Sequence, residues 1–250
     1  MARIYAVANQ KGGVGKTTTA VNLAACLAEA GETALVVDLD PQANATSGLG
    51  EHANGTSSYD LLDGAPLGEL AKPTRFANLS LVPSKADLAG AVIELARRDD
   101  GEEYLRQALA SGADEYEYVF LDCPPSLGPL TVNALAAADR VLVPVQAEYY
   151  ALEGLAEIMR SIELIKTRLN PRLGVAGLLL TMVDSRTRLA ADVEAEVRRH
   201  FGELVFRTTV PRSVRLAEAP SHGLPAIAYD RRSPGADAYW KVAMELVERA

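Results

Sequence analysis

Short, continuous apolar runs alternate along the chain with longer segments whose apolar residues recur at helical spacing. The runs lie at 4–8, 33–39, 79–83, 118–122, 140–145 and 174–182. Runs of this kind are typical of strands buried on both faces of a parallel sheet. Apolar residues recur at helical spacing in 20–28, 58–62, 87–97 and 102–110, and in a segment that follows 146–154 and runs to about 169. Residues 48–60 have the composition of an exposed loop. The pattern predicts an α/β fold, a mostly parallel twisted sheet with helices on both faces.

Length and composition favour one domain over residues 1–250, because 48% of the 250 residues are hydrophobic. No stretch of 18 apolar residues occurs, and the first strand begins almost at Met1. We therefore expect no signal peptide and a cytoplasmic protein. The two cysteines, Cys26 and Cys123, lack C-x-x-C spacing, so neither a disulfide framework nor a zinc site is expected.

A glycine-rich loop links the first apolar run to the first helical segment. Its residues are Gln10, Lys11, Gly12, Gly13, Val14, Gly15, Lys16, Thr17, Thr18 and Thr19. Strand, glycine loop and helix in this order make a phosphate cradle, a P-loop, in which backbone N–H groups and the helix N-terminus surround an anion. Lys16 is placed to contact the β- and γ-phosphates of a nucleotide, and the Thr17 hydroxyl to ligate Mg²⁺.

The loop departs from the common pattern, because Gln10 stands where the first glycine is usual and a second lysine, Lys11, follows. In this respect the sequence resembles the deviant Walker A ATPases, which include ParA/Soj partitioning proteins, MinD-like cell-division ATPases and nitrogenase iron proteins. The resemblance implies that residues 11–18 bind ATP and that Lys11 reaches the ATP of a second copy in a homodimer. The alternative is that Lys11 is a plain surface lysine beside a glycine turn.

Two aspartates follow apolar runs. The segment 38–44, Asp-Leu-Asp-Pro-Gln-Ala-Asn, is similar to a ParA/Soj segment with Ala43 in place of the usual glycine, which implies that Asp40 helps to position the attacking water and the Mg²⁺ shell. Asp122 ends the run 118–122 and is placed to hold the water shell of Mg²⁺. The alternatives are that Asp40 caps the turn before Pro41 and that Asp122 caps a turn or helix.

Three later segments also resemble ParA/Soj proteins: 146–154, 183–189 and 210–221. The likeness implies that Arg186 and Arg215 bind DNA without sequence preference and that Pro211 lies beside the adenine. Arginine suits this task because its planar fork donates two parallel hydrogen bonds to a phosphate. The alternative is that such arginines pair with glutamates, for example Glu218, on a solvated surface.

The chain carries a formal net charge of −8, which argues against a wholly basic nucleic-acid binder, but residues 186–250 carry +2 and the first 185 residues −10. A local positive surface is compatible with these counts. The balanced charges of 238–250 predict a helix docked on the sheet and not a basic membrane anchor, so a MinD-like membrane ATPase is the second interpretation. The cysteine positions disfavour the iron proteins.

The resemblance spans residues 2–250 and implies an ATP- and Mg²⁺-dependent segregation ATPase. ATP would form the dimer, the dimer would bind nonspecific double-stranded DNA and so the nucleoid, and a ParB/Spo0J-type partner would stimulate the weak intrinsic hydrolysis. Because the glycine loop starts about ten residues into the chain, we expect no N-terminal helix-turn-helix domain. A fold that binds partners without turning ATP over is a third possibility.

Overall fold

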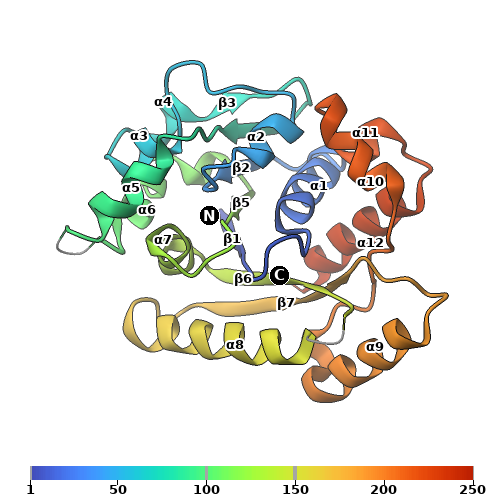
Figure 1. The fold of residues 1–250 in the computed structure, drawn as a ribbon. Coiled ribbons are helices and arrows are strands. Elements are labelled where there is room, and N and C mark those ends of the chain that lie inside the picture. The colour runs from blue at the N-terminus through green and yellow to red at the C-terminus, as the bar shows by residue number, and fades with distance from the viewer. Residues whose placement is uncertain (1, 99–100, 149–150, 250) are drawn as a thin grey trace.

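The computed structural model describes residues 2–98, 101–148 and 151–249 (Figure 1). Met1 and Ala250, the ends of the predicted domain, lie outside the described residues, as do Tyr149 and Tyr150 of the ParA/Soj-like segment 146–154.

Seven strands form one sheet in the order β3-β4-β2-β5-β1-β6-β7. Their bounds are Arg3–Val7 (β1), Ala34–Asp38 (β2), Lys72–Pro73 (β3), Leu79–Val82 (β4), Tyr118–Asp122 (β5), Arg140–Gln146 (β6) and Gly174–Thr181 (β7). Every pair of neighbours is parallel except the short edge pair β3 and β4. The six predicted strands are confirmed, and the two-residue β3 was not predicted, because it lacks an apolar run.

Helices cover both faces of the sheet, as predicted (Figure 1). They are α1 (Lys16–Glu29), α2 (Asn44–Gly48), α3 (Ser58–Leu62), α4 (Leu67–Leu70), α5 (Leu88–Leu95), α6 (Tyr104–Leu109), α7 (Pro129–Ala137), α8 (Ala151–Arg168), α9 (Arg188–Phe201), α10 (Val214–Glu218), α11 (Ala226–Tyr229) and α12 (Pro234–Glu248), with the 3₁₀ turn η3 (Ala219–His222). Alternate residues of each strand point to opposite faces, so the core has two halves. Helices α1 and α12 pack on one, and α5 to α8 on the other.

Two expectations needed correction. Residues 48–60 are not one exposed loop, because Gly48 ends α2 and both Ser57 and Ser58 are fully buried. Ser57 caps α3 in a capping box with Asp60, and this cap draws the end of the segment into the protein. Helix α7 was not predicted, because apolar residues occur on most sides of it and leave no clear helical period.

The C-terminal helix α12 confirms the prediction of a docked helix. Tyr239, Val242 and Leu246 of α12 are at most 1% exposed and pack in the same half of the core as α1. The apolar face of α12 is therefore occupied within the chain. None of the helices in the described ranges combines the length and apolar composition needed to cross a bilayer.

The strand register brings the predicted site residues to one edge of the sheet. Asp122 at the end of β5 lies directly beside Val7 of β1 on one side and Asp38 of β2 on the other. Chain segments leaving the carboxyl ends of parallel strands meet at this edge. The glycine loop, Asp40 and Asp122 thus come together, although more than 100 residues separate the first from the last.

Candidate functional site

The glycine loop leaves β1 and enters α1 without a break. Gly13 and Gly15 have φ angles of 74° and 91°, values that favour glycine because a Cβ would strain the backbone. Helix α1 begins at Lys16, four residues before the segment expected from spacing, so Lys16 and Thr17 lie in its first turn. The first-turn N–H groups have no intrahelical acceptor, and this end of the helix dipole is positive. An anion is therefore favoured there.

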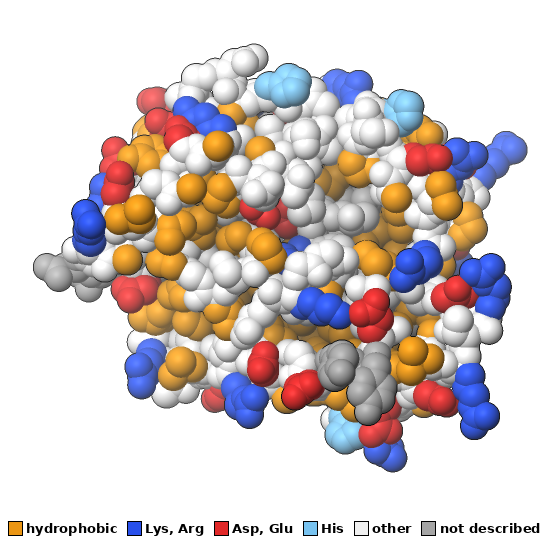
Figure 2. Space-filling view, viewed as in Figure 1, with side chains coloured by type: hydrophobic (Ala, Val, Ile, Leu, Met, Phe, Trp, Pro, Cys, Tyr) orange, Lys and Arg blue, Asp and Glu red, His pale blue; other side chains and the backbone are white. Residues whose placement is uncertain are grey.

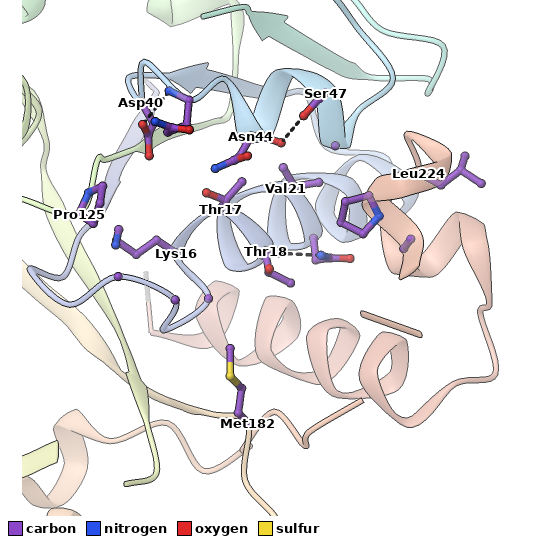
Figure 3. Close-up of a pocket in the computed structure, with 18 residues that line it drawn as sticks. Lys16, Thr17, Thr18, Val21, Asp40, Asn44, Ser47, Pro125, Met182 and Leu224 are labelled. Atoms are coloured by element: carbon purple, nitrogen blue, oxygen red, sulfur yellow. Dashed lines mark hydrogen bonds between the residues drawn. The ribbon is translucent and has the colours of Figure 1, made fainter. Parts of the chain in front are cut away.

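A pocket of about 400 Å³ opens above this loop, and its size is typical of small-molecule sites (Figure 3). Most of the predicted loop residues line it: Gly12, Gly13, Gly15, Lys16, Thr17 and Thr18, together with Asp40. Residues that were not predicted complete the lining: Val21, Asn22, Gln42, Asn44, Ser47, Gly48, Pro125, Met182, Ala219, Pro220 and Leu224. The pocket therefore has one wall from the first 50 residues and another from η3.

Lys16 lines this pocket, and its ammonium group is placed to bind an anion there. Its side chain is 6% exposed, and its Nζ donates a hydrogen bond of 3.1 Å to the Lys11 carbonyl oxygen. Burial lowers the pKa of Lys16, while the negative charge of Asp122 opposes the shift. A buried ammonium group with one carbonyl partner has donors left for phosphate oxygens.

Asp122 is fully buried, and neither of its carboxylate oxygens has a hydrogen-bond partner among the described residues. Burial raises the pKa of Asp122 well above its usual range, and the negative charge of the neighbouring Asp38 raises it further. Such an orphaned carboxylate is costly unless a cation or water completes it. It fits the predicted role beside Mg²⁺, which keeps several waters and takes few protein ligands.

The neighbouring aspartates differ in what they hold. Asp38 accepts hydrogen bonds from the Thr46 N–H (2.8 Å) and hydroxyl (2.7 Å), and burial raises its pKa to about 6. Asp40 lines the pocket and also accepts a 2.9 Å hydrogen bond from the Gln42 N–H. The turn-capping alternative for Asp40 is thus present in the structure, and Asp40 lines the pocket as well.

The two lysines of the loop lie in different places. Lys16 enters the pocket, whereas Lys11 is about half exposed and its Nζ lies 2.8 Å from the Glu148 carboxylate. Gln146 donates a further hydrogen bond to the same carboxylate. Lys11 is therefore neither a free surface lysine nor a ligand of its own pocket in this structure.

Two residues predicted to bind the nucleotide, Val14 and Pro211, are not part of the pocket lining. Val14 is 1% exposed, and its carbonyl accepts a 2.8 Å hydrogen bond from Thr181, which fixes the loop to β7. Pro211 forms a bridge with Val183, the neighbour of the pocket residue Met182. The bridge places Pro211 next to the pocket wall without making it part of the lining.

Sequence reasoning missed Met182 and Asn22. Met182 has a φ of 52°, a conformation that is strained for a residue with a Cβ and that clusters at functional sites. Asn22 is buried, donates to the Thr18 carbonyl and accepts a 2.7 Å hydrogen bond from the Ala226 N–H. No local sequence pattern predicts that either residue lines the pocket, although a polar residue on an otherwise apolar helix face is a usable signal for Asn22.

The arginines predicted to bind DNA are exposed and already paired. Arg186 is 86% exposed and bonds Asp184 at 2.7 Å, and this pairing holds the pKa of Asp184 at about 2. Arg215 lies 2.9 Å from Glu218, which matches the alternative of surface ion pairing. In Figure 2, basic side chains interspersed with acidic ones gather on the side where Figure 1 places α9 to α11. Exposed pairs of this kind are weak, so a polyanion can compete for them.

Neither cysteine adds chemistry to the site. Cys26 is buried in α1, where burial raises its pKa to about 12, and burial likewise raises the pKa of Cys123. Both thiols are therefore protonated and inert near neutral pH. Within the described residues, no group of three or more His, Cys, Asp or Glu is arranged to hold a metal ion by itself.

Known proteins resemble this chain over its whole length. A family model described as an AAA domain matches residues 2–175. The chain is 53% identical to the chromosome partitioning protein ParA of Myxococcus xanthus over 99% of this chain and 88% of that protein. It is 55% identical to the chromosome-partitioning ATPase Soj of Thermus thermophilus over 99% and 96%.

A solved structure agrees with the fold. The cobyrinic acid a,c-diamide synthase of Mycobacterium smegmatis, with a bound ATP analogue and magnesium, superposes with a TM-score of 0.87 at 37% identity and covers 99% of this chain and 95% of that one. Its sequence identity to this chain is lower than that of the two partitioning proteins.

Proposed function

The chain belongs to the ParA/Soj family of chromosome-partitioning ATPases, and we propose that it acts as an ATP-driven switch for binding nonspecific double-stranded DNA. In this switch ATP and Mg²⁺ occupy the pocket of each monomer, two monomers close around the nucleotides, and the dimer binds DNA. Hydrolysis returns monomers that bind DNA poorly. The protein would then work in the cytoplasm on the nucleoid.

The separation of the two loop lysines is the observation that carries this proposal. Lys16 lies inside the pocket, where it can hold the β- and γ-phosphates of the nucleotide in its own subunit. Lys11 points to Glu148 at the surface, so it is available to the phosphates of a second copy. Charge neutralisation from two subunits would make the terminal phosphate the link between them.

Hydrolysis in this proposal uses residues of the same edge. Magnesium, when bound, neutralises charge on the terminal phosphates. Thr17 and Asp122 would hold its ligand shell, and Asp122 has two unpartnered oxygens for bound water. Asp40 would orient the attacking water through a hydrogen bond. The intrinsic rate would be low, with a ParB-type partner and DNA raising it.

DNA binding would gain from dimerisation because the dimer doubles the number of basic contacts. The affinity for DNA depends steeply on the number of phosphates neutralised, since each contact releases counterions. Arg186 and Arg215 are the proposed contacts on each subunit, and both are more than half exposed. A MinD-like membrane role is less well supported, because the apolar face of α12 is buried in the core.

A titration of random-sequence duplex DNA tests the proposal. Binding is measured by fluorescence anisotropy at several salt concentrations, with ADP or with a non-hydrolysable ATP analogue. We expect tighter binding with the analogue and a steep loss with salt. Binding that ignores both nucleotide and salt would contradict it, and nucleotide-dependent binding to anionic liposomes without binding to DNA would favour the membrane ATPase.

A further inference from the structure

Two pocket walls that are distant in the sequence meet at a pair of glycines. Gly50 follows α2, which supplies Asn44, Ser47 and Gly48 to the pocket, and Gly223 follows η3, which supplies Ala219 and Pro220. A Cβ placed on Gly223 would lie 2.5 Å from the Cα of Gly50, so the two backbones touch directly. Their φ angles of 75° and 63° also favour glycine.

Arg75 holds this contact together. It lies between β3 and β4, and its guanidinium donates to the Gly223 carbonyl and, at 3.2 Å, to the His222 carbonyl. Its Nη2 also lies 3.0 Å from the position a Cβ would take on Gly50. Within the described ranges no carboxylate pairs with Arg75, so its charge is directed at backbone carbonyls. A contact between two glycines buries little surface, and directional hydrogen bonds are what can fix its geometry.

The first of the two joined segments, α2 with Gly50, is hydrogen-bonded to the part of the pocket around Asp40. Thr46 of α2 donates two hydrogen bonds to Asp38, and its hydroxyl accepts a 2.9 Å hydrogen bond from the Ser84 N–H. The Ser84 hydroxyl in turn donates a 2.7 Å hydrogen bond to the Asp40 carbonyl. Helix α2 therefore cannot shift without moving the backbone around Asp40. A ligand that orders Asp40 would order Gly50 as well.

The second segment leads to the basic surface. Helix α10 carries Arg215 and continues directly into η3, so the two share Glu218 and Ala219 at their junction. The Glu218 carboxylate is bonded by Arg215 and by the Tyr229 hydroxyl at 3.3 Å. The position of η3 thus sets where Arg215 stands.

We infer that Arg75 is a positioning residue that couples the nucleotide pocket to the α10 surface by holding Gly223 against Gly50. The inference rests on the proposed switch, since it assigns the path by which the nucleotide acts on the DNA-binding surface. Small displacements at a ligand site reach a distant surface when packed elements transmit them as units.

Hydrogen exchange and DNA binding test the coupling in the full-length chain. The variants are Arg75→Ala, Arg75→Lys and, as a control, Arg97→Ala, which removes an exposed arginine whose side chain forms no hydrogen bond or ion pair with the described residues. In the unaltered protein we expect Mg²⁺ and an ATP analogue to slow amide exchange both in 11–19 and in 214–218, which is helix α10 and does not line the pocket. Arg75→Ala should keep the protection of 11–19 and lose that of 214–218.

The ratio of DNA affinities with ATP analogue and with ADP is the second readout. This ratio should fall about fivefold or more in Arg75→Ala, which is the lower end of the range of allosteric coupling. It should fall less in Arg75→Lys and stay unchanged in Arg97→Ala. An equal loss with both nucleotides would make Arg75 a DNA contact and overturn the coupling, as would unchanged protection of 214–218. If Arg75→Ala does not fold, Arg75→Lys decides by the same two readouts.

The exchange experiment separates this inference from the proposed function. Nucleotide protection of 214–218 that depends on Arg75 supports the coupling even if the unaltered protein binds no DNA, in which case only the switch fails. DNA binding that responds to nucleotide equally in the unaltered protein and in Arg75→Ala sustains the switch and overturns the coupling.

Discussion

The Nζ of Lys11 lies 2.8 Å from the carboxylate of Glu148, within its own subunit and outside the pocket that Lys16 enters. The side chains are 51% and 45% exposed, so the ion pair is a surface pair worth about 0–1 kcal/mol. A phosphate group of a second copy can displace it at small cost. The pair therefore favours the monomer only slightly.

Glu148→Gln should strengthen ATP-dependent dimerisation about two- to fivefold, because it removes the competitor for Lys11 worth up to about 1 kcal/mol. Sedimentation velocity with an ATP analogue measures the dimer fraction. Glu153→Gln is the matched control, since Glu153 lies on α8 near Lys11 but forms no ion pair with it. Weaker dimerisation of Glu148→Gln would mean that Glu148 contributes to the interface itself.

Asp122→Asn should stabilise the nucleotide-free protein while weakening Mg²⁺-dependent nucleotide binding. Burial raises the pKa of Asp122 in the folded state, so folding takes up a proton and this contribution to stability is lost as pH rises from about 4. We expect a melting temperature at least about 2 °C above that of the unaltered protein at pH 7, and a smaller gain at pH 5.

The exposed Asp192 on α9 provides the control for this experiment. Its side chain is 69% exposed, so Asp192→Asn should show neither the gain in melting temperature nor a change in Mg²⁺ dependence. A gain for Asp122→Asn that does not shrink toward low pH would contradict the assignment of the raised pKa to Asp122.

Arg186→Ala should make the plot of log K for DNA binding against log salt concentration less steep, by about one unit of slope per subunit. Arg186 is 86% exposed, and Asp184 is its one side-chain partner among the described residues. Arg172→Ala is the matched control, because Arg172 is exposed at the opposite end of β7. Equal slopes for both variants would remove Arg186 from the DNA-binding surface.

Ala43→Gly should raise stability by up to about 1 kcal/mol, or about 2–4 °C in melting temperature. Ala43 has a φ of 54°, a left-handed conformation that costs a residue with a Cβ about 1–2 kcal/mol, part of which glycine loses in backbone entropy. Ala30→Gly is the comparison, because Ala30 has a φ of −76° and should be destabilised by the same change. Calorimetry decides, and a loss of stability for Ala43→Gly would show that the left-handed conformation is not strained.

The strand ends were predictable and the opposite pocket wall was not. Apolar runs located β2 and β5, and the parallel order then required Asp38, Asp40 and Asp122 to share an edge. Pro220 and Leu224 line the pocket because α11 and α12 pack back onto α1, an arrangement that no local sequence pattern indicates. The role of Arg75 depends on contacts 147 and 148 residues away, and it lies outside any motif.

The position of Ala43 shows a second limit of sequence reasoning. The resemblance shows only that Ala43 replaces the usual glycine and gives no reason for glycine at this position. The structure gives the physical reason for glycine there, since the residue before α2 adopts a positive φ. Backbone conformation at a single residue does not follow from hydrophobic periodicity.

Sedimentation of the unaltered protein and of Lys11→Ala, each with Mg²⁺ and either ADP or an ATP analogue, tests the central claim most directly. We predict that the unaltered protein forms dimers with the analogue and monomers with ADP, and that Lys11→Ala binds the analogue yet stays monomeric. An unaltered protein that remains monomeric with bound analogue, or dimers of Lys11→Ala at the same concentration, would contradict it.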